Sequence, residues 1–382
     1  MSGQLGSWPD IALSGVRAVH DRSAGPSVVR DRRRSAPRRL GTGRACRRPA
    51  AAPGGAVTMT TTHAVRALGA LAHRGTHAPT EACGCAPPAV LADRSDGTVV
   101  RSGPVVAKAH APDADAPALA ARLTLAASPR LAGILLPPLP AGPEEGVTVE
   151  GRAVSLWPYG LPVDPADPDA APWEEAAGLL ARLHRTRPPH PLPPMRGPAK
   201  AARAVARMRA ARPRTPGRAA GAAPVLAAWR GLPGWARGEA PAPADRARFL
   251  CHGDLHLGQL VRHPAPDGPW LLIDVDDAGL GDPAWDLARP AAWYAAGLLA
   301  PEVWLRFLDA YRAGGGPAVR PHGDPWPELD VPARALTVQT AALAVAKSVA
   351  EDRDPDEVER LMIDACARIA CLPDELGPAP TP

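Results

Sequence analysis

Several residue types are scarce or missing in this sequence of 382 residues. It has no Asn, three Lys, three Gln, three Tyr and two Phe, while Ala and other helix-forming residues dominate. It contains no uninterrupted apolar run long enough to span a bilayer and no apolar core of a secretory signal, so we expect neither a membrane span nor export. Six Cys do not form a disulfide framework in a chain of this length, so we expect reduced thiols in a cytoplasmic protein.

Charge is distributed unevenly along the chain. Residues 1–58 carry eleven Arg against three Asp, a balance of +8, whereas residues 270–382 carry nine Arg or Lys against nineteen Asp or Glu, a balance of −10. The overall charge of +5 therefore reflects the first segment and says little about the rest. With 46% apolar residues, the chain is long enough to bury a sizeable core divided between two lobes.

The basic segment 1–58 is rich in Gly, Pro, Ser and Arg and has little hydrophobic periodicity. It cannot bury enough apolar surface to offset its ordering entropy, so we expect it to be disordered. A nucleic-acid-binding arm and a transit peptide are two functional interpretations of it. We favour an extension of the gene model, because MTTTHAVRALGALAHR, beginning at Met59, resembles a natural chain start. We therefore expect no nucleic-acid partner and no membrane partner.

Between residues 87 and 157 the sequence is strand-like, with short apolar runs separated by turn signals. The predicted strands are PAVLA at 88–92, TVVRS at 98–102, GPVVAKA at 103–109, ILLPPL at 134–139, GVTV at 146–149 and RAVSLW at 152–157. One helix, PALAARLTLAAS at 117–128, is predicted among them. We therefore assign residues 59–158 to an N-terminal, nucleotide-binding lobe built on a small antiparallel sheet.

Beyond residue 158 the sequence favours helices. WEEAAGLLARLHR at 173–185 repeats its apolar residues at helical spacing, and most of the chain after residue 185 is also helical in pattern. The exception is the region around 250–275, where FLCHGDL and PWLLIDV are short apolar runs that flank polar residues. The predicted fold class is α+β, with a helical C-terminal lobe at 159–382 that carries this polar region.

The polar region has the spacing of a kinase catalytic loop, which is written H-x-D-x-x-x-x-N. Here His252, Asp254 and Gln259 occupy the three positions, and Asp274 follows on the next apolar run. Phosphoryl transfer from ATP needs a carboxylate to orient and deprotonate the acceptor hydroxyl, oxygen ligands for Mg²⁺, and a cation on the phosphates. The combination of HGD, an amide five positions later and a second Asp indicates this chemistry.

The stretch HGDLHLGQ…LLIDVDDAGLGDPAWDLA resembles the aminoglycoside phosphotransferase and choline-kinase-like family, over roughly 87–375. The resemblance implies a protein-kinase-like two-lobed fold, ATP and Mg²⁺ as cofactors, and a small-molecule acceptor with a hydroxyl group. It implies that Asp254 is the catalytic base and that Gln259 and Asp274 are metal ligands. Gln259 replaces the usual Asn, but maltokinase-like relatives carry the same HGDLHLGQ loop.

The resemblance also points to two residues of the N-terminal lobe. Lys108, in VVAKAH on the third predicted strand, lies where the family's phosphate-binding Lys sits, and Arg does not replace that compact charge freely. A solvated Lys at a strand end is the alternative. SLWPYG at 155–160 resembles the hinge that offers backbone groups to adenine, which brings Trp157 to the nucleotide; a core Trp is an equal explanation.

Other residues of the motif are expected to support the site. We expect His252 to anchor the loop by hydrogen bonds, His256 to be structural and Asp286 to brace the loop. Asp276 is expected to be either a further ligand or a residue behind the ligands.

Two features of the family pattern are missing. No G-x-G-x-x-G precedes Lys108, and the helix predicted at 117–128 contains no Glu to pair with it. Asp113 or Asp115 could substitute, or Lys108 could be held by phosphate alone.

The predicted function is ATP-dependent transfer of the γ-phosphate to a hydroxyl of an aminoglycoside, amino sugar or sugar-like molecule. The negative balance of 270–382 favours a cationic acceptor, although a solvated face also explains EDRDPDEVE at 351–359. The alternative is a nucleotide-binding pseudokinase that acts as a scaffold. The missing Glu and glycine loop favour it, and the intact Asp254, Asp274 and Lys108 oppose it. A nucleic-acid binder acting through the basic segment is a third hypothesis.

Overall fold

The computed structural model describes residues 56–75, 86–94, 96–140, 147–214, 217 and 219–372. Nearly all of the basic segment therefore lies outside the described residues, together with Cys46, Cys83 and Cys85. The predictions made for that segment lie there too: its disorder, the nucleic-acid arm, the transit peptide and the extension. Of the other cysteines, Cys251 and Cys366 are buried and Cys371 is exposed, all as free thiols.

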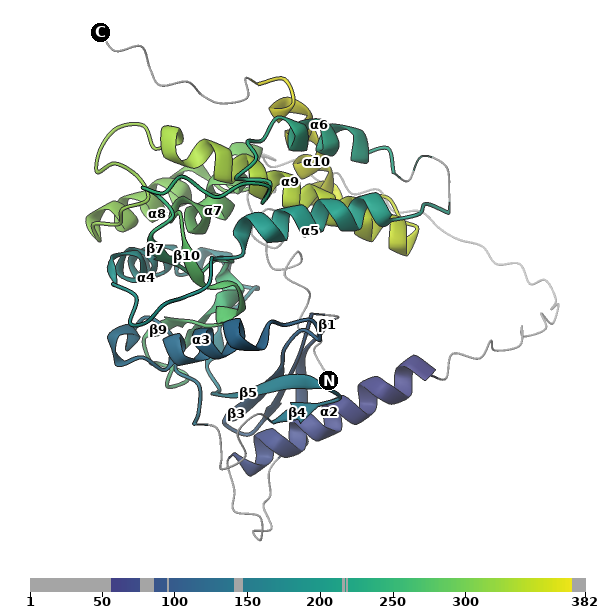
Figure 1. The fold of residues 1–382 in the computed structure, drawn as a ribbon, viewed down its shortest axis with the longest axis vertical. Coiled ribbons are helices and arrows are strands. Elements are labelled where there is room, and N and C mark those ends of the chain that lie inside the picture. The colour runs from purple at the N-terminus through teal and green to yellow at the C-terminus, as the bar shows by residue number, and fades with distance from the viewer. Residues whose placement is uncertain are drawn as a thin grey trace, which may run out of the picture.

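The N-terminal part is a five-stranded antiparallel sheet in the order β1-β2-β3-β5-β4 (Figure 1). Its strands are β1 Ala89–Arg94, β2 Gly97–Ser102, β3 Val105–Ala109, β4 Thr148–Val149 and β5 Arg152–Pro158. These agree with five of the six predicted strands. In β3, burial alternates along the strand, so that Val105, Ala107 and Ala109 face one side and Lys108 the other. This alternation determines which way the Lys108 side chain points.

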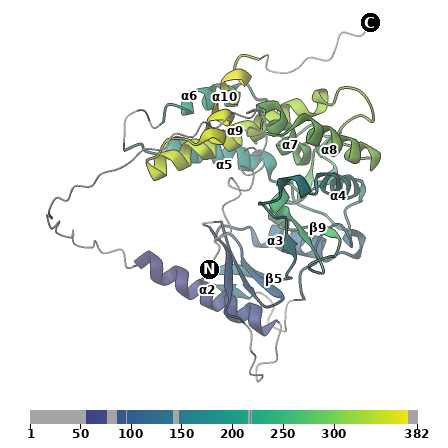
Figure 2. The same ribbon diagram turned by 180° about the vertical axis from the view of Figure 1, so that it is seen from behind.

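Helix α2, Ala56–Arg74, lies along this sheet in both views (Figures 1 and 2). Ala64, Leu68 and Ala72 recur at a spacing of four and are buried in one cluster with Val100 and Ala107. The helix thus covers the sheet face opposite Lys108. Sequence reasoning treated this stretch only as a chain start, although the four-residue spacing is a helical signal.

The prediction that ILLPPL at 134–139 forms a strand of this sheet is wrong. Leu135 makes one isolated bridge, to Leu272 of the C-terminal part, and Leu139 donates a single backbone hydrogen bond to Leu156. Two consecutive prolines, Pro137 and Pro138, have no N–H to donate and cannot sustain a ladder. The segment instead links the two parts of the molecule.

The C-terminal part is mainly helical (Figures 1 and 2). Its α-helices are α4 Trp173–Arg185, α5 Gly197–Ala210, α6 Ala222–Arg230, α7 Ala284–Ala296, α8 Pro301–Ala313, α9 Trp326–Glu351 and α10 Glu357–Ile369. Helix α4 has the predicted bounds. A single large cluster of buried residues runs through these helices and forms the main core. The predicted α+β class, a small antiparallel sheet followed by a helical lobe, is confirmed.

Short strands hold the polar region of the helical part. β7 Phe249–Cys251 pairs with β10 Gly279–Gly281, while β8 Leu260–Arg262 pairs with both β6 Leu161–Pro162 and β9 Trp270–Leu272. The HGD segment leaves β7, and Asp274 follows β9. These two pairings bring the two predicted motifs together. Helix α3, Ala116–Ala126, lies between the sheet and this region (Figure 1).

Across the described residues, no helix is both long and apolar enough to cross a membrane.

Candidate active site

Lys108 and Asp274 meet across the two parts of the molecule. The ammonium Nζ of Lys108 lies 2.6 Å from Oδ1 of Asp274 and 3.1 Å from Oδ2 of Asp276. The side-chain amide of Gln259 donates to Oδ2 of Asp274 over 3.2 Å. Burial by itself lowers the pKa of Lys108, but the two carboxylates outweigh it and hold that pKa above its usual value. Lys108, Gln259 and Asp274, predicted separately, thus form one cluster.

Asp274 adopts an unusual backbone conformation. Its φ of 64° and ψ of 72° lie in the left-handed region, which a residue with a Cβ occupies at a cost of about 1–2 kcal/mol. The residue stands between strand β9 and the short 3₁₀ turn Val275–Asp277. Such strained positions concentrate where a side chain must be aimed at a ligand. Here the strain accompanies the turn of the carboxylate toward Lys108 and Gln259.

Asp254 is held by two cations, one at each of its carboxylate oxygens. Lys200, on α5, lies 2.7 Å from its Oδ2, and Arg289, on α7, lies 2.7 Å from its Oδ1. Burial raises the pKa of Asp254, but Lys200 and then Arg289 outweigh it and hold the pKa well below its usual range. The side chain is only 17% exposed. Asp254 is therefore an ionised and firmly oriented carboxylate.

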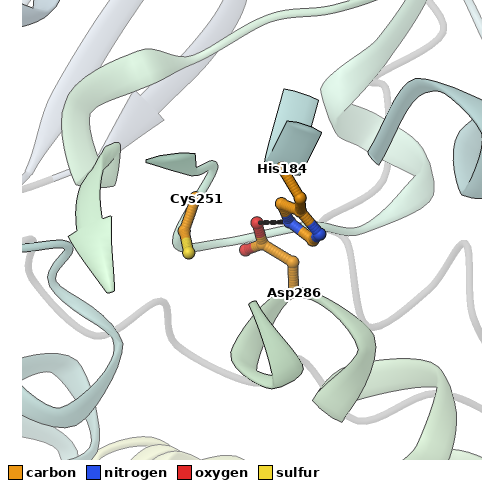
Figure 3. A group of neighbouring side chains, drawn as sticks. All are labelled: His184, Cys251 and Asp286. Carbon is orange, nitrogen blue, oxygen red and sulfur yellow. Dashed lines mark hydrogen bonds and ion pairs between the residues drawn. The ribbon is translucent and has the colours of Figure 1, made fainter. Parts of the chain in front are cut away.

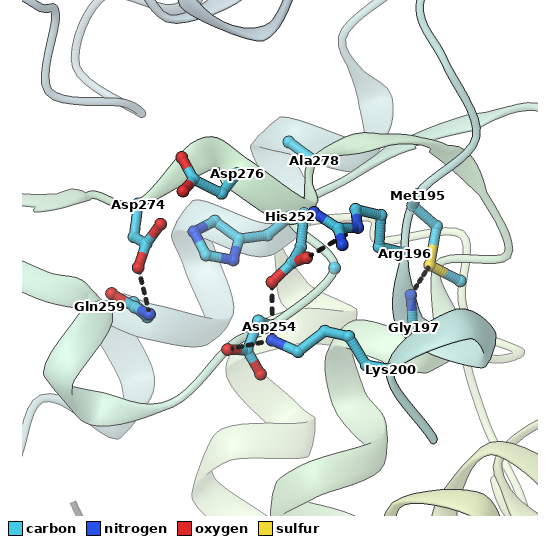
Figure 4. A network of polar contacts seen from close by, with 12 residues as sticks. Met195, Arg196, Gly197, Lys200, His252, Asp254, Gln259, Asp274, Asp276 and Ala278 are labelled. Atoms are coloured by element: carbon cyan, nitrogen blue, oxygen red, sulfur yellow. Dashed lines mark hydrogen bonds and ion pairs between the residues drawn. The ribbon is translucent and has the colours of Figure 1, made fainter. Parts of the chain in front are cut away.

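Lys200 contacts Asp254 (Figure 4) and also Asp277, so one ammonium is shared by two carboxylates. Its Nζ lies 2.6 Å from Oδ2 of Asp277. Burial raises the pKa of Asp277, and neighbouring Asp254 adds to that shift against the effect of Lys200. Arg196 lies on the other side of Asp277, with 3.6 Å between Nε and Oδ1.

The backbone of the HGD loop, residues 252–254, is anchored by Asp286 of α7. Its Oδ2 accepts the N–H of His252 over 2.6 Å, and its Oδ1 accepts the N–H of Gly253 over 2.7 Å. Gly253 has a φ of +84°, and a Cβ there would collide with the carbonyl oxygen of Asp277. The glycine of HGD is thus required by its conformation and by its surroundings. The bracing role expected for Asp286 agrees with these contacts.

Behind Asp286 lies a fully buried polar cluster (Figure 3). Nε2 of His184 lies 2.9 Å from Oδ2 of Asp286, and Nδ1 of His184 lies 2.7 Å from the hydroxyl of Tyr311. His184, Asp286 and Cys251 have potential metal-ligating atoms within 4.8 Å of one another. However, both ring nitrogens of His184 and both oxygens of Asp286 already have hydrogen-bond partners, and burial raises the pKa of the Cys251 thiol well above its usual value. We assign this cluster a structural role.

His252 anchors the loop in the way its position predicts. Nε2 donates to the carbonyl oxygen of Ile273 over 2.8 Å, which ties the catalytic loop to the residue before Asp274. His256, two residues after Asp254, is mostly buried, with 13% of its side chain exposed, and burial lowers its pKa to about 3. Its ring is therefore neutral near pH 7 and supplies no positive charge to the loop.

A hydrogen-bonded chain links Asp276 to Trp157. Nδ1 of His110 lies 3.0 Å from Oδ2 of Asp276, and its Nε2 lies 2.7 Å from the hydroxyl of Ser155. The indole N–H of Trp157 donates to that same hydroxyl oxygen over 2.8 Å. The Trp157 side chain is buried in the main core. The structure therefore places Trp157 on β5 within one chain of contacts from the carboxylates.

Helix α3 contains one cation, Arg122, and no acidic residue. Nε of Arg122 donates to the carbonyl oxygen of Ala278 over 2.7 Å and is buried there. Asp115 caps the start of α3 by accepting the N–H of Ala118. Of the substitutes considered for the missing Glu, Asp115 is thus engaged elsewhere and Asp113 is exposed, while Asp274 and Asp276 are the carboxylates that Lys108 contacts.

The comparisons with known proteins complete this description. Residues 21–331 match the model of the phosphotransferase enzyme family, which is more than half of the chain. The chain belongs to this family. This membership supports the phosphotransferase chemistry that the HGD motif predicted. No protein in a search of curated sequences matches it.

Two solved structures show a similar fold over most of the chain. A choline/ethanolamine kinase family protein from Mesorhizobium loti is 16% identical with a TM-score of 0.51, over 83% of this chain and 96% of that one. An amicoumacin kinase in complex with AMP-PNP, Ca²⁺ and Ami is also 16% identical, with a TM-score of 0.53, over 76% of this chain and 90% of that one. The predicted protein-kinase-like two-lobed fold is confirmed.

Proposed function

We propose that this phosphotransferase transfers the γ-phosphoryl group of ATP to a hydroxyl group of a small molecule. Asp254 orients the hydroxyl and accepts its proton, Lys108 binds the phosphates, and Trp157 lies behind the adenine. Residues 59–158 form the nucleotide-binding lobe and residues 159–382 the lobe with the catalytic loop. The proposal is carried by one observation: the Lys108 ammonium reaches the Asp274 carboxylate, 2.6 Å away, from the opposite lobe.

Gln259 and Asp274 have suitable donors for Mg²⁺. A carboxylate and an amide carbonyl are oxygen ligands of the kind that Mg²⁺ prefers, usually one or two per site alongside phosphates and waters. The Asp274 side chain is 36% exposed, which leaves room for ligand oxygens on one side. Gln259 would have to present its carbonyl oxygen, since its amide nitrogen now faces Asp274. Bound there, Mg²⁺ would neutralise phosphate charge; amicoumacin kinase was solved with AMP-PNP and Ca²⁺.

The transfer step requires little covalent chemistry from the protein. The proton of the acceptor hydroxyl passes to Asp254, and the acceptor oxygen forms a bond to the γ-phosphorus. The bond between that phosphorus and its bridging oxygen breaks, and the electron pair remains on ADP. Orientation supplies most of the protein's contribution, and Arg289 and Lys200 keep the Asp254 carboxylate in one place.

For the acceptor we propose an aminoglycoside, an amino sugar or a sugar-like molecule. The acidic stretch at 351–359 gives little reason to prefer a cation. Arg353 there binds Glu351 at 2.7 Å and Glu359 at 2.6 Å, so part of its negative charge is neutralised locally. At the proposed base, the carboxylates of Asp254 and its neighbour Asp277 are already paired with Lys200. A neutral polyol therefore fits the site as well as an amine does.

A second candidate is a nucleotide-binding protein that transfers no phosphate. The observation in its favour is that α3 presents Arg122 to the Ala278 carbonyl and supplies no acid to Lys108. Such a protein would bind Mg–ATP through the same cluster and use it as a structural signal.

An acceptor screen with γ-labelled ATP and Mg²⁺ tests the proposal. The panel contains aminoglycosides, amino sugars, neutral sugars and amino alcohols, and the proteins are the wild type, Asp254→Asn and a control, Asp267→Asn. Asp267 is exposed on the β8–β9 hairpin. We expect the wild type and the control to label the same compounds and Asp254→Asn to lose at least about 100-fold in rate. Equal labelling by Asp254→Asn refutes the role of Asp254, whereas stabilisation by Mg–ATP without labelling supports the second candidate.

A further inference from the structure

Lys200 is a partly buried cation that belongs to no motif, with 24% of its side chain exposed. It lies in the first half of α5, and its ammonium contacts Asp254 at 2.7 Å and Asp277 at 2.6 Å (Figure 4). Burial lowers the pKa of Lys200, but Asp254 and then Asp277 outweigh it and raise the pKa above its usual value. Lys200 is therefore a charged ammonium held beside the base.

Lys108 and Lys200 contact two ends of the same turn. Lys108 contacts Asp274 and Asp276, and Lys200 contacts Asp277, the last residue of the 3₁₀ turn Val275–Asp277, as well as Asp254. The two lysines approach this turn from opposite lobes, Lys108 from β3 and Lys200 from α5. In the proposed reaction the phosphoryl group leaves the phosphates near Lys108 and meets the hydroxyl near Asp254, so it moves from one ammonium toward the other.

Neighbouring cations are less suited to receive that group. His256 lies 3.9 Å from Asp254 but is neutral, because burial lowers its pKa to about 3. Arg289 is bound to the other oxygen of Asp254, and its Nε also donates to the carbonyl oxygen of Leu255 over 3.0 Å. Lys200 carries its charge on a flexible stem, and its ammonium has three donors for two carboxylate contacts. One donor is left for an incoming oxygen.

We propose that Lys200 is a catalytic residue that binds an oxygen of the phosphoryl group during its transfer while it keeps its contact with Asp254. The inference rests on the proposed function and deepens it. Charge on the phosphoryl oxygens is then stabilised from both lobes, by Lys108 before the transfer and by Lys200 as the group reaches the acceptor. Preorganised charge of this kind accelerates phosphoryl transfer because it needs no rearrangement during the step.

The test uses Mg²⁺, ADP and aluminium fluoride, which together mimic the phosphoryl group in transfer and need no known acceptor. The proteins are the wild type, Lys200→Met and the matched control Lys347→Met, which removes the remaining lysine of the chain, on α9. Calorimetry measures the affinity for Mg–ADP with and without fluoride, and ATP turnover gives kcat and KM.

We expect Lys200→Met to bind Mg–ADP with an affinity within about threefold of the wild type. Addition of aluminium fluoride should raise that affinity at least about tenfold less in Lys200→Met than in the wild type. Its kcat is expected to fall about 100-fold, with KM for ATP little changed, because one charge on the transferring group is removed. Lys347→Met should match the wild type. Fluoride tightening and kcat at wild-type values in Lys200→Met would overturn the inference.

A folding defect is separated from a catalytic one by two further variants. Lys200→Gln keeps hydrogen-bonding groups without the charge, and Lys200→Met with Asp277→Asn removes one charge of each sign. Loss of fluoride tightening in whichever variant melts near the wild-type temperature supports the inference, and retention refutes it. If the wild type itself shows neither Mg–ADP binding nor ATP turnover, the proposed function has failed, which is a different result.

Discussion

Lys108 and Asp274 are separated by 166 residues in the chain and by 2.6 Å in the structure. The ion pair joins the sheet lobe to the turn that follows β9, and it is further supported by Asp276 and His110. Asp276 lies 3.1 Å from the same ammonium, so in the proposed function it would remain as a partner of Lys108 if Asp274 bound a metal ion.

The left-handed backbone of Asp274 leads to a first prediction. Asp274→Ala and Asp274→Gly both remove the carboxylate, but Gly avoids the steric cost at a φ of 64°. We expect Asp274→Gly to be more stable than Asp274→Ala by about 1 kcal/mol in urea unfolding. At Asp276, which lies inside the 3₁₀ turn, the order should reverse, with Ala the more stable. The same order at both positions would contradict the assigned strain.

The catalytic-loop glycine gives a second prediction. Gly253→Ala places a methyl group against the carbonyl of Asp277 at a φ of +84°, so both the backbone strain and the collision destabilise the loop. Gly151→Ala is the matched control, because its φ is +75° but no atom lies within 4 Å of the added Cβ. We expect the control to lose about 1 kcal/mol and Gly253→Ala to lose at least about 2 kcal/mol more. Equal losses, measured by urea unfolding, would show that the contact with Asp277 is unimportant.

Asp286 is the third position to examine. It accepts hydrogen bonds from two backbone N–H groups and faces His184, so Asp286→Asn replaces a carboxylate by an amide that can turn only one acceptor oxygen to these donors. We expect a loss of at least about 2 kcal/mol in the free energy of unfolding. The exposed Asp309→Asn on α8 is the control and should change stability by less than about 0.5 kcal/mol. A stability of Asp286→Asn like that of the control would argue against the bracing role.

His256 gives a prediction about pH. Its pKa is about 3 in the folded chain, against 6.5 as the ordinary value, because burial and then Arg289 and Lys200 outweigh Asp254 and Asp274. Above pH 6.5 both states are neutral and His256 adds nothing. Below pH 6.5 the unfolded chain binds a proton that the folded chain does not, so stability falls progressively toward pH 3.

The measurement is urea unfolding of the wild type and His256→Gln at pH 7.5 and pH 5. Between these values the wild type should lose about 2 kcal/mol more than the variant, from about 1.4 kcal/mol per pH unit below 6.5. Titration of other groups affects both proteins alike. Parallel losses would mean that His256 is protonated in the folded chain.

Much of the site was predictable because its signals are local. Asp254 and Gln259 lie on one loop at the kinase spacing, and the turn signals around β3 place Lys108 on a strand. The structure adds what sequence spacing cannot show, namely that these residues meet. Their chemical roles stay predictions.

Other features depend on contacts between distant segments. Lys200 and Arg289 reach Asp254 from α5 and α7, and no spacing links them to the HGD motif. A composition signal for Lys200 existed, since the chain uses Lys at only three positions. The error at 134–139 had a local cause, because its apolar residues outweighed two prolines in the prediction.

The scarcity of lysine makes the candidate site chemically distinctive. The chain has three lysine side chains with which an amine-acylating reagent can react. Two of them, Lys108 and Lys200, are ion-paired ammonium groups in the site. Protonated amines react slowly, so acylation at these two positions reports the breaking of their ion pairs, with the partly exposed Lys347 as an internal reference. Mass spectrometry of the acylated protein would thus follow ligand binding at the site one residue at a time.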